Sequence, residues 1–352
     1  MSESNHRFNE IKTARENMRV LCTGGAGYVG SSCVRWLLAN GHDAVAYDNL
    51  SEGNRESLPE DRLIIGDIED RQRLTQALRS HQSEAVMHFA AVACVPQSVR
   101  EPDLYWRVNV LGTKSMLDAM VDAKVDKLVF SSTAATYCFD AQMPLAEESK
   151  QAPQVPYGTT KLACEWMIKE YGRAFGMGYV ILRYFNASGA DVYGEFGESR
   201  RSESHLIPLI LYTALGLRDK ISIYGTDWDT RDGTCVRDYV HTDDLASAHQ
   251  LVLEHLQSGY GREYNIGTGR GTTVLEVLKA SEDVVGFPLK YEIVGKRLGD
   301  PPVLIACPDR LMSELGWKPR FTEIREIVET AWRWHRAYPE GYRSKLERVA
   351  AR

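Results

Sequence analysis

A glycine-rich turn between an apolar run and an amphipathic segment constrains the fold of this chain more than any other feature. The run "MRVLCTG" (18–24) predicts a strand, and "YVGSSCVRWLLANG" (28–41) has the apolar spacing of a helix. Between them, Gly24, Gly27 and Gly30 allow a tight turn and let the backbone approach a pyrophosphate at the helix N-terminus. The pattern therefore predicts a strand–turn–helix unit that binds a dinucleotide, with a purely structural turn as the alternative.

Strand-like and helical stretches continue to alternate through the first half of the chain. Further strands are expected over 43–49, 62–67, 85–91, 127–133 and 179–186, and further helices over 70–81, 108–123 and 156–176. Such alternation favours βαβ units. We therefore expect an α/β fold, a Rossmann-type doubly wound parallel sheet with helices on both faces.

The second half is less regular and predicts a smaller α/β lobe. Helices are expected over 205–216 and 242–256, and strands over 220–225 and 263–269. A chain of 352 residues exceeds the size at which a single core stops growing.

The domain organisation follows from these patterns. We expect a polar N-terminal tail over 1–17, a dinucleotide-binding domain over 18–186 and a mainly substrate-binding lobe over 187–352. Segments near 236–268 are expected to return to the first domain.

Charge and cysteine content narrow the class of partner. The net charge of −6 gives no long-range attraction for nucleic acid or anionic lipid, and no apolar run approaches the length that spans a bilayer. The seven cysteines are widely spaced without a CxxC pair, which indicates neither a disulfide framework nor a metal site. We expect a cytoplasmic protein with a small-molecule partner, no nucleic acid or membrane partner, and no metal.

An acid at the end of the second strand indicates which dinucleotide is bound. Asp48 lies 24 residues after Gly24, where a carboxylate can accept both hydroxyls of the adenosine ribose. It would repel a 2′-phosphate, so NAD is favoured over NADP.

Hydroxyl side chains end the strand over 127–133, and a tyrosine and a lysine follow. Ser131, Ser132 and Thr133 lie where ligands bind in an open α/β sheet, although such residues also serve as turns and caps. In "PYGTTK", Tyr157 and Lys161 are four residues apart and share a helix face, a spacing that alone is common.

Together these motifs make the chain similar to the extended short-chain dehydrogenase/reductase family, whose catalytic core is a Ser/Thr, a Tyr and a Lys in YxxxK. The resemblance implies that Tyr157 is a base, with its pKa lowered by Lys161 and an oxidised nicotinamide. Thr133 would hydrogen-bond the reacting oxygen, and Lys161 would also bind the nicotinamide ribose.

Longer matches from about residue 18 to 340 resemble the UDP-sugar 4-epimerases of this family. They are "TGGAGYVGS", "DNLSEG", "GDIED", "HFAA", "SSTAATY", "PYGTTK", "LRYFNASGA", "HLIP", "DGTCVRDYVHTDDLA", "YNIGTG" and "ELGWKP". The resemblance implies that a UDP-sugar substrate binds to the second lobe. It also implies interconversion of UDP-galactose and UDP-glucose through a 4-keto intermediate on tightly held NAD. A homodimer through helices 108–123 and 156–176 would follow from the same resemblance.

The resemblance assigns site residues one by one. The implied NAD-binding residues are Gly24, Gly27, Tyr28, Val29, Gly30, Asp48, Asn49, Asp67, Ile68, Phe89, Ala90, Ala91, Asn109, Ser131, Tyr157, Lys161 and Tyr184. The implied substrate-binding residues are Thr133, Asn186, His205, Leu206, Ser222, Tyr224, Arg237, Arg297, Asp300 and Leu304. Among these, Arg237 and Arg297 would clamp the diphosphate, Tyr224 would pack beside uracil and Asp300 would accept the uridine ribose hydroxyls.

Departures from the family pattern separate the possible reactions. The chain has "TAA" at 133–135, where related dehydratases and decarboxylases have an acid, so both of those reactions lack a needed group. Leu304 matches a position where a large aromatic favours plain hexoses and a small residue admits N-acetyl sugars. The alternatives that stay open are a 4-epimerase of another UDP-sugar, such as UDP-N-acetylglucosamine, UDP-glucuronate or UDP-xylose, a non-catalytic redox sensor, and an ordinary sugar reductase.

Overall fold

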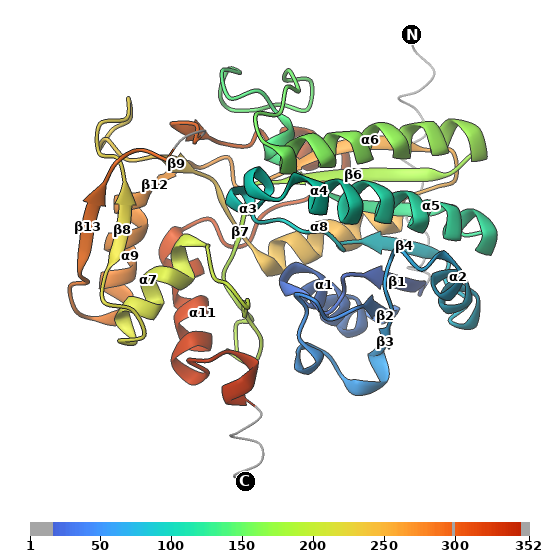
Figure 1. The fold of residues 1–352 in the computed structure, drawn as a ribbon, viewed down its shortest axis with the longest axis horizontal. Coiled ribbons are helices and arrows are strands. Elements are labelled where there is room, and N and C mark those ends of the chain that lie inside the picture. The colour runs from blue at the N-terminus through green and yellow to red at the C-terminus, as the bar shows by residue number, and fades with distance from the viewer. Residues whose placement is uncertain (1–16, 298–299, 346–352) are drawn as a thin grey trace.

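The largest feature of the computed structural model, which describes residues 17–297 and 300–345, is a seven-stranded sheet (Figure 1). Its strands all pair in parallel, in the order β11-β6-β5-β4-β1-β2-β3. They are β1 (Arg19–Thr23), β2 (Asp43–Asp48), β3 (Leu63–Ile65), β4 (Ala85–His88), β5 (Lys127–Thr133), β6 (Gly178–Tyr184) and β11 (Gly261–Ile266). The prediction of a Rossmann-type doubly wound sheet is confirmed.

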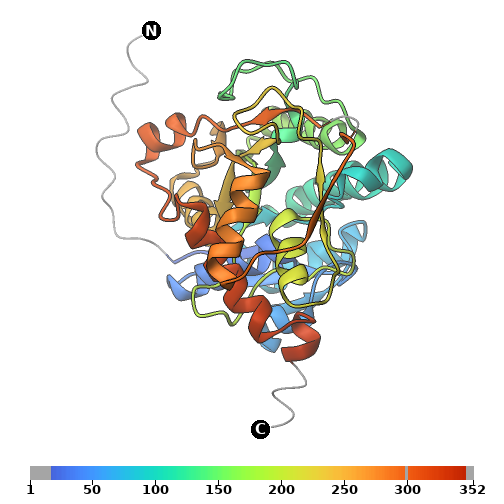
Figure 2. The same cartoon turned by 90° about the vertical axis from the view of Figure 1, so that its left-hand side faces the viewer.

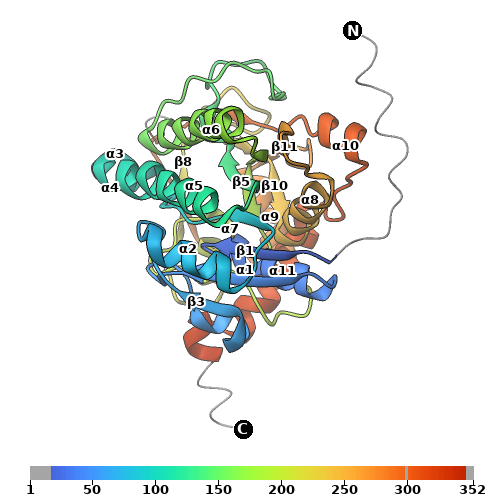
Figure 3. The same ribbon diagram turned by 90° about the vertical axis from the view of Figure 1, so that its right-hand side faces the viewer.

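Helices cover both faces of this sheet, and each face has its own apolar core (Figure 3). One face carries α1 (Tyr28–Ala39), α8 (Thr242–His255) and α10 (Asp309–Leu315), and the other carries α2 (Arg71–Ser80), α5 (Gly112–Ala123) and α6 (Pro156–Phe175). Neighbouring strand residues alternate between the two cores, so Val20 packs on the first face and Leu21 on the second. Burial on both faces explains why the strands read as continuous apolar runs.

The helix expected over 108–123 differs at its start. A π-helical turn, η3 (Trp106–Leu111), leads directly into α5. Two short helices that were not predicted, α3 (Val95–Arg100) and α4 (Pro102–Tyr105), lie before it. Both have a proline in the first turn and are too short to show a helical period in sequence.

The second lobe is built on three helices packed together (Figure 2). These are α7 (Leu206–Ala214), α9 (Val274–Val285) and α11 (Ile324–Ala337), and they share a core with β8 (Ile221–Tyr224). The remaining short strands are β7 (Asn186–Ser188), β9 (Val236–Arg237), β10 (Tyr239–His241), β12 (Thr272–Thr273), β13 (Tyr291–Val294) and β14 (Val303–Leu304). The remaining short helical turns are η1 (Arg55–Ser57), η2 (Glu60–Arg62) and η4 (Ala134–Thr136). We did not predict α9 and α11, although "TTVLE" carries the capping box that starts α9.

Late segments of the chain lie with the large sheet. Strand β11 pairs with β6 at its edge, and α8 packs against α1. The division at 186/187 and the assignment of residues near 236–268 to the first domain stay predictions. The predicted tail over 1–17 falls outside the described residues except for its last residue.

Within residues 17–297 and 300–345, no helix is long and apolar enough to cross a membrane.

Candidate active site

The glycine turn after β1 is a tight backbone cradle. Gly24 has φ +70°, and a Cβ atom there would lie 2.4 Å from the amide nitrogen of Ala90. A Cβ at Gly30 would lie 2.3 Å from the carbonyl oxygen of Gly24. Gly27 is the N-cap of α1 and has no side chain to satisfy the first amides of the helix. These residues fit a dinucleotide pyrophosphate, which needs close backbone approach and free amide donors.

Asp48 is fixed at the end of β2 beside this turn. One carboxylate oxygen accepts the amide of Ala26 at 2.9 Å and the other accepts the amide of Leu50 at 2.8 Å. Burial raises the pKa of Asp48, and the two backbone hydrogen bonds oppose that rise. Each oxygen keeps a further acceptor direction, which suits the paired hydroxyls of a ribose.

Three neighbouring residues predicted to bind NAD are Asn49, Asp67 and Ile68. The Asn49 amide donates to the Asp67 carboxylate at 2.8 Å. Ile68 is buried in the core beneath α5, where a Cβ at Gly112 would meet its side chain at 2.5 Å. The structure thus gives Ile68 a packing role.

The segment after β4 packs directly on the glycine turn. The amides of Phe89 and Ala90 donate to the Thr23 carbonyl at 2.8 and 3.0 Å. Asn109 is almost fully buried and braces this segment, because its side chain pairs with both the amide and the carbonyl of Val92 at 2.9 and 3.1 Å. The Asn109 side chain therefore fixes the backbone of the segment after β4, which carries the predicted NAD-binding residues Phe89, Ala90 and Ala91.

The predicted catalytic residues meet where β5 ends and α6 begins. The side chains of Thr133 and Tyr157 lie close enough there for Thr133 to lower the pKa of the phenol. One turn further along α6, the Lys161 ammonium donates to the backbone carbonyl of Ser131 at 2.8 Å and lies over the Phe130 ring. The structure therefore brings all three predicted catalytic side chains to one corner of the sheet.

Burial dominates the electrostatics of this corner. Burial raises the pKa of Tyr157, while the hydrogen bond with Thr133 and the charge of Arg200 act against the rise. Burial lowers the pKa of Lys161 to about 8, while Cys164 and Glu165 raise it. The lowering of the Tyr157 pKa that we expect from Lys161 and an oxidised nicotinamide stays a prediction.

Arg237 and its partners form the centre of the second lobe's predicted site. In the register of β9 and β14, Arg237 lies beside Leu304. One Arg237 guanidinium nitrogen donates to the Val236 carbonyl at 2.8 Å, and another is 3.8 Å from the Asp300 carboxylate. Leu304 packs against the core around Tyr137, next to the strand end that carries Thr133.

A second arginine stacks on the predicted uracil neighbour. The Arg297 guanidinium carbon lies 3.9 Å from the centre of the Tyr224 ring, and this ring is 40% exposed. Ser222 donates its hydroxyl to Glu292 at 3.0 Å, so its side chain is already bonded within the β8–β13 pair. An exposed aromatic with a cation on its face is a platform on which a base can stack.

His205, at the start of α7, belongs to a charged cluster that we did not predict. Its Nδ1 lies 2.7 Å from the buried carboxylate of Glu198, which also accepts a hydrogen bond from Arg200 at 2.6 Å. Although burial alone would raise it, His205 and Arg200 together bring the pKa of Glu198 to about 2. Glu203 completes a group whose ligand atoms lie within 4.8 Å of one another. Because Arg200 neutralises Glu198, the chain supplies this cluster with its own cation.

Three further predicted residues, Tyr184, Asn186 and Leu206, lie on β6, on β7 and at the start of α7. Tyr184 ends β6 with its ring 5.7 Å from that of His249, and the amide of Asn186 donates to the Asp238 carbonyl at 2.9 Å. Leu206 begins α7 and is partly buried against its core. The predicted contacts of Val29 and Ala91 have no further feature that tests them.

The loop from Gly189 to Arg201 joins the nucleotide side to the second lobe. Tyr28 donates its hydroxyl to the Gly189 carbonyl at 2.6 Å, and Asn54 donates to the Ser199 carbonyl at 2.9 Å. On the other side, the Trp334 indole of α11 donates to the Glu198 carbonyl at 2.9 Å. The loop is therefore bonded to the glycine turn and to the second lobe at once.

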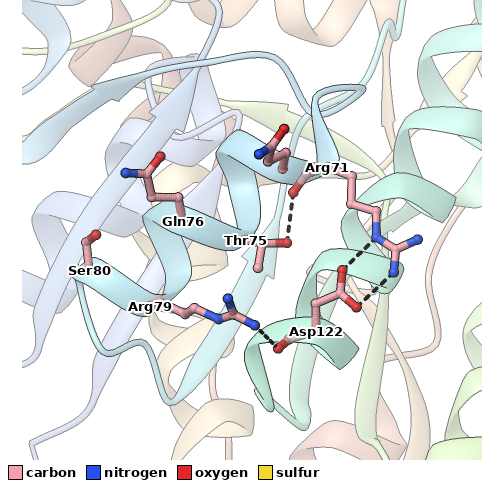
Figure 4. Close-up of a pocket in the computed structure, with 7 residues that line it drawn as sticks. Arg71, Thr75, Gln76, Arg79, Ser80 and Asp122 are labelled. Carbon is pink, nitrogen blue, oxygen red and sulfur yellow. Dashed lines mark hydrogen bonds and ion pairs between the residues drawn. The ribbon is translucent and has the colours of Figure 1, made fainter.

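A separate hollow of about 530 Å³ lies on the outer surface of α2 (Figure 4). The residues that line it are Arg71, Gln72, Thr75, Gln76, Arg79, Ser80 and Asp122. Arg71 and Asp122 form a two-point ion pair across it at 2.7 and 2.8 Å. None of these residues was predicted for the site, and the Arg71 charge is already matched.

Comparison with known proteins relates the chain to one family of enzymes. Residues 20–267 match the model of the NAD dependent epimerase/dehydratase family. A UDP-glucose 4-epimerase of Halalkalibacterium halodurans is 45% identical over 326 residues, which are 92% of this chain and 98% of that protein. A UDP-glucose 4-epimerase of Rhizobium meliloti is 46% identical over 327 residues, covering 93% of this chain and 99% of that protein.

Solved structures give the same result in three dimensions. The UDP-glucose 4-epimerase of Brucella ovis in complex with NAD is 42% identical with a TM-score of 0.86, covering 89% of this chain and 97% of that one. The enzyme of the same name from Bifidobacterium longum, in complex with NAD+ and UDP, is 33% identical with a TM-score of 0.87. That match covers 92% of this chain and 99% of that one.

Proposed function

The chain belongs to the NAD-dependent epimerase/dehydratase family, and we propose that it interconverts UDP-galactose and UDP-glucose at C4′ of the hexose. The observation that carries this function is the meeting of the Thr133 and Tyr157 side chains at the end of β5, with Lys161 one turn further along α6. The protein is an isomerase whose cofactor is NAD, as in its relatives.

Tyr157 is the base of the proposed reaction. Its phenolate takes the proton of the 4′-hydroxyl as the C4′–H bond breaks, which leaves a 4-keto sugar. Bound NAD supplies the acceptor for the C4′ hydride and the source from which it returns. Tyr157 then gives its proton back to the 4′-oxygen, so the overall reaction changes only the configuration at C4′.

Thr133 and Lys161 support Tyr157 in the proposed reaction. Thr133 hydrogen-bonds the reacting oxygen and holds it at the strand end, close to the phenol. Lys161, one turn further along α6, lowers the free energy of the phenolate through its positive charge. The chain has alanine at 134 and 135, where related dehydratases have the acid that drives elimination. Without that acid, the 4-keto sugar can only be reduced again.

The second lobe binds the UDP part of the substrate in this proposal. Arg237 and Arg297 offer planar donors to the diphosphate, since a guanidinium matches phosphate oxygens. Tyr224 stacks on uracil and Asp300 accepts the uridine ribose hydroxyls. Leu304 lies beside Arg237 and is intermediate in size, so we propose weak activity on N-acetylhexosamines as well.

Two further proposals concern the assembly and the compartment. Large apolar side chains are exposed on the neighbouring elements η3 and α6, namely Trp106, Leu111, Trp166 and Phe175. We propose that they form a homodimer contact through helices 108–123 and 156–176. All seven cysteines are free thiols, which fits a reducing compartment such as the cytoplasm.

A single assay without added cofactor tests the proposed function. Purified protein shown to contain NAD is mixed with UDP-galactose, and UDP-glucose is measured by chromatography. We expect UDP-glucose to form until both sugars reach equilibrium. Absence of product would refute the function, and consumption of added NADH with a keto sugar would identify a reductase.

A further inference from the structure

Three consecutive residues at the end of β5 contact three successive turns of α6. The pairs, from the first turn to the third, are Thr133 with Tyr157, Ser131 with Lys161 and Ser132 with Glu165. Residues four apart on a helix share one face, so the three helix residues form a single row. The first two helix members are proposed to be catalytic, and the third has no part in the reaction as described so far.

Glu165 is the most enclosed member of this row. It is 0% exposed, and the Ser132 hydroxyl donates to it at 2.5 Å. Arg183 donates to both of its oxygens, at 3.0 Å from Nε and 2.6 Å from Nη2, and Gln151 donates at 3.1 Å. A carboxylate taken fully out of water is costly unless such partners surround it. The residues around Glu165 therefore stabilise a buried carboxylate whose desolvation would otherwise be costly, next to the predicted catalytic residues.

Arg183 connects this carboxylate to the sheet. It is 2% exposed on β6 and lies directly opposite Ser132 in the β5–β6 register. Its Nη1 donates to the Tyr137 hydroxyl at 2.9 Å, and that hydroxyl donates to Asn265 of β11 at 2.7 Å. The hydrogen-bond network that begins at Glu165 thus reaches three neighbouring strands, β5, β6 and β11.

We propose that Glu165 is a positioning residue of the epimerase site, which ties the third turn of α6 to the end of β5 and thereby fixes Tyr157 and Lys161 relative to Thr133. The proposal rests on the proposed function, because it explains how that site keeps its geometry. Glu165 touches neither substrate nor NAD in it. Its effect passes through Ser132 and through the rigid helix.

The charge of Glu165 adds a second effect on Lys161. Burial lowers the pKa of Lys161, and the Glu165 carboxylate raises it. Without that carboxylate, Lys161 would lose its proton more easily and would stabilise the Tyr157 phenolate less. The other charged or titratable groups around the row are His88 on β4, Tyr105 on α4, Cys164 on α6, Arg183 and Tyr184 on β6 and Arg200 in the loop after β7. They are unchanged in the variants below, so a shift is assigned to residue 165.

Two variants separate the charge of Glu165 from its link to the strand. Glu165→Gln keeps the shape of the side chain and removes the charge, and Ser132→Ala keeps the ion pair and removes the link. Asp244→Asn is the matched control, because Asp244 is also a buried carboxylate that accepts two amides, those of Arg320 and Phe321, at 2.8 and 2.9 Å. It lies at the start of α8 and has no proposed role in the reaction.

The readouts are kcat and KM for UDP-galactose and the titration of Tyr157 in the NAD-containing protein. The titration uses NMR of ¹³C-labelled tyrosine, with Tyr157→Phe identifying the signal. For Glu165→Gln we expect kcat to fall about 10- to 100-fold with KM within about threefold, as for a misplaced catalytic group. Tyr157 should titrate about one pH unit higher. Ser132→Ala should lower kcat with a smaller change in that titration.

Two results would overturn the proposal. One is a Glu165→Gln protein with wild-type kcat and a wild-type Tyr157 titration. The other is a loss of kcat that Asp244→Asn reproduces, with the Tyr157 titration unchanged, since this would mark a general effect of removing a buried carboxylate. If wild-type protein forms no UDP-glucose, the proposed function fails, and the titration still decides whether Glu165 acts on Tyr157.

Discussion

The Tyr28 hydroxyl donates to the carbonyl of Gly189 at 2.6 Å and joins the glycine turn to the loop after β7. These two residues are far apart in sequence and belong to the two parts of the molecule that we expect to hold NAD and UDP-sugar. A change in the glycine turn can therefore shift the loop after β7 as well as the predicted NAD site. The turn is the place to test the cofactor site.

Gly24→Ala should remove NAD from the purified protein. The added methyl group would lie 2.4 Å from the Ala90 amide nitrogen, and the residue needs φ +70°. We expect less than about a tenth of the wild-type NAD content, measured by absorbance after acid release, and a lower Tm. Gly176→Ala is the control, because Gly176 also has positive φ while a Cβ there meets nothing within 4 Å. Full NAD content in Gly24→Ala would show that NAD binding does not need glycine at position 24.

Tyr157→Phe should keep NAD and lose turnover. The variant removes the proposed base and little volume, so the fold and the cofactor site should be preserved. We expect kcat to fall by about 10³-fold or more, because Tyr157 transfers the proton in both directions and a positioned general base usually contributes about 10²- to 10⁴-fold. Activity is followed by chromatography with NAD content measured on the same sample. A variant with more than about a tenth of wild-type kcat would exclude Tyr157 as the base.

Arg237→Lys should weaken the binding of UDP and leave NAD in place. A lysine keeps the charge and loses the planar pair of donors, and it also gives up the contact with Asp300. We expect the Kd for UDP, measured by calorimetry, to rise about tenfold, or about 1.4 kcal/mol. Arg231→Lys is the control, since Arg231 pairs with Glu276 on the surface nearby. An equal effect of the two variants would argue against a specific clamp at Arg237.

Trp166→Glu should produce a monomer. Trp166 is 59% exposed on α6, and a charge there would disrupt an apolar contact between copies of the chain. Light scattering after size exclusion should show half the wild-type mass. Tyr193→Glu provides the control, because Tyr193 is 81% exposed in the loop after β7. A wild-type monomer would remove the dimer proposal.

Stability should fall as the pH drops below about 6.5, because buried histidines stay neutral in the fold. Burial lowers the pKa of His88 to about 3, and it lowers those of His249 and His335 to about 4. An unfolded histidine takes up its proton near pH 6.5, so the unfolded chain binds more protons than the folded chain between pH 4 and 6.5. The free energy of unfolding therefore falls as the pH drops through this range. Each such histidine should contribute a slope of about 1 kcal/mol per pH unit to the free energy of unfolding near pH 5.5.

Urea unfolding at several pH values measures that slope. His335→Gln should reduce it by the share of one histidine, whereas the exposed His255→Gln should leave it unchanged. A slope that responds equally to both substitutions would show that burial is not its cause.

The fold was predictable where a period and a turn signal coincided. The strand before Gly24 and the helix after it were both found, because apolar residues buried on two faces give continuous runs that glycines interrupt. The meeting of Thr133 and Tyr157 could be predicted for the same reason, since Thr133 ends a strand and Tyr157 lies in the first turn of a helix. The helix α11 was missed, although it buries Ile327 and Trp334 on one face.

What stayed hidden depended on contacts between distant residues. Glu165 has the same four-residue spacing from Lys161 that Lys161 has from Tyr157, so its position was visible, but its partner Arg183 lies on another strand. The cluster of Glu198, Arg200 and His205 gave no period and no known spacing. Such pairs are fixed by the tertiary fold, and a single sequence does not state them.

The bond between Lys161 and residue 131 has a consequence for how this corner can change over generations. Lysine donates to the main-chain carbonyl of Ser131, and every amino acid at position 131 offers that same carbonyl. As far as this bond is concerned, substitutions at 131 are free to accumulate. At 132 the bond to Glu165 uses a side-chain hydroxyl, so the residue there must itself carry a hydrogen-bond donor in its side chain. For these two bonds, neighbouring positions on one strand are therefore under opposite constraints, because α6 contacts the backbone at 131 and the side chain at 132.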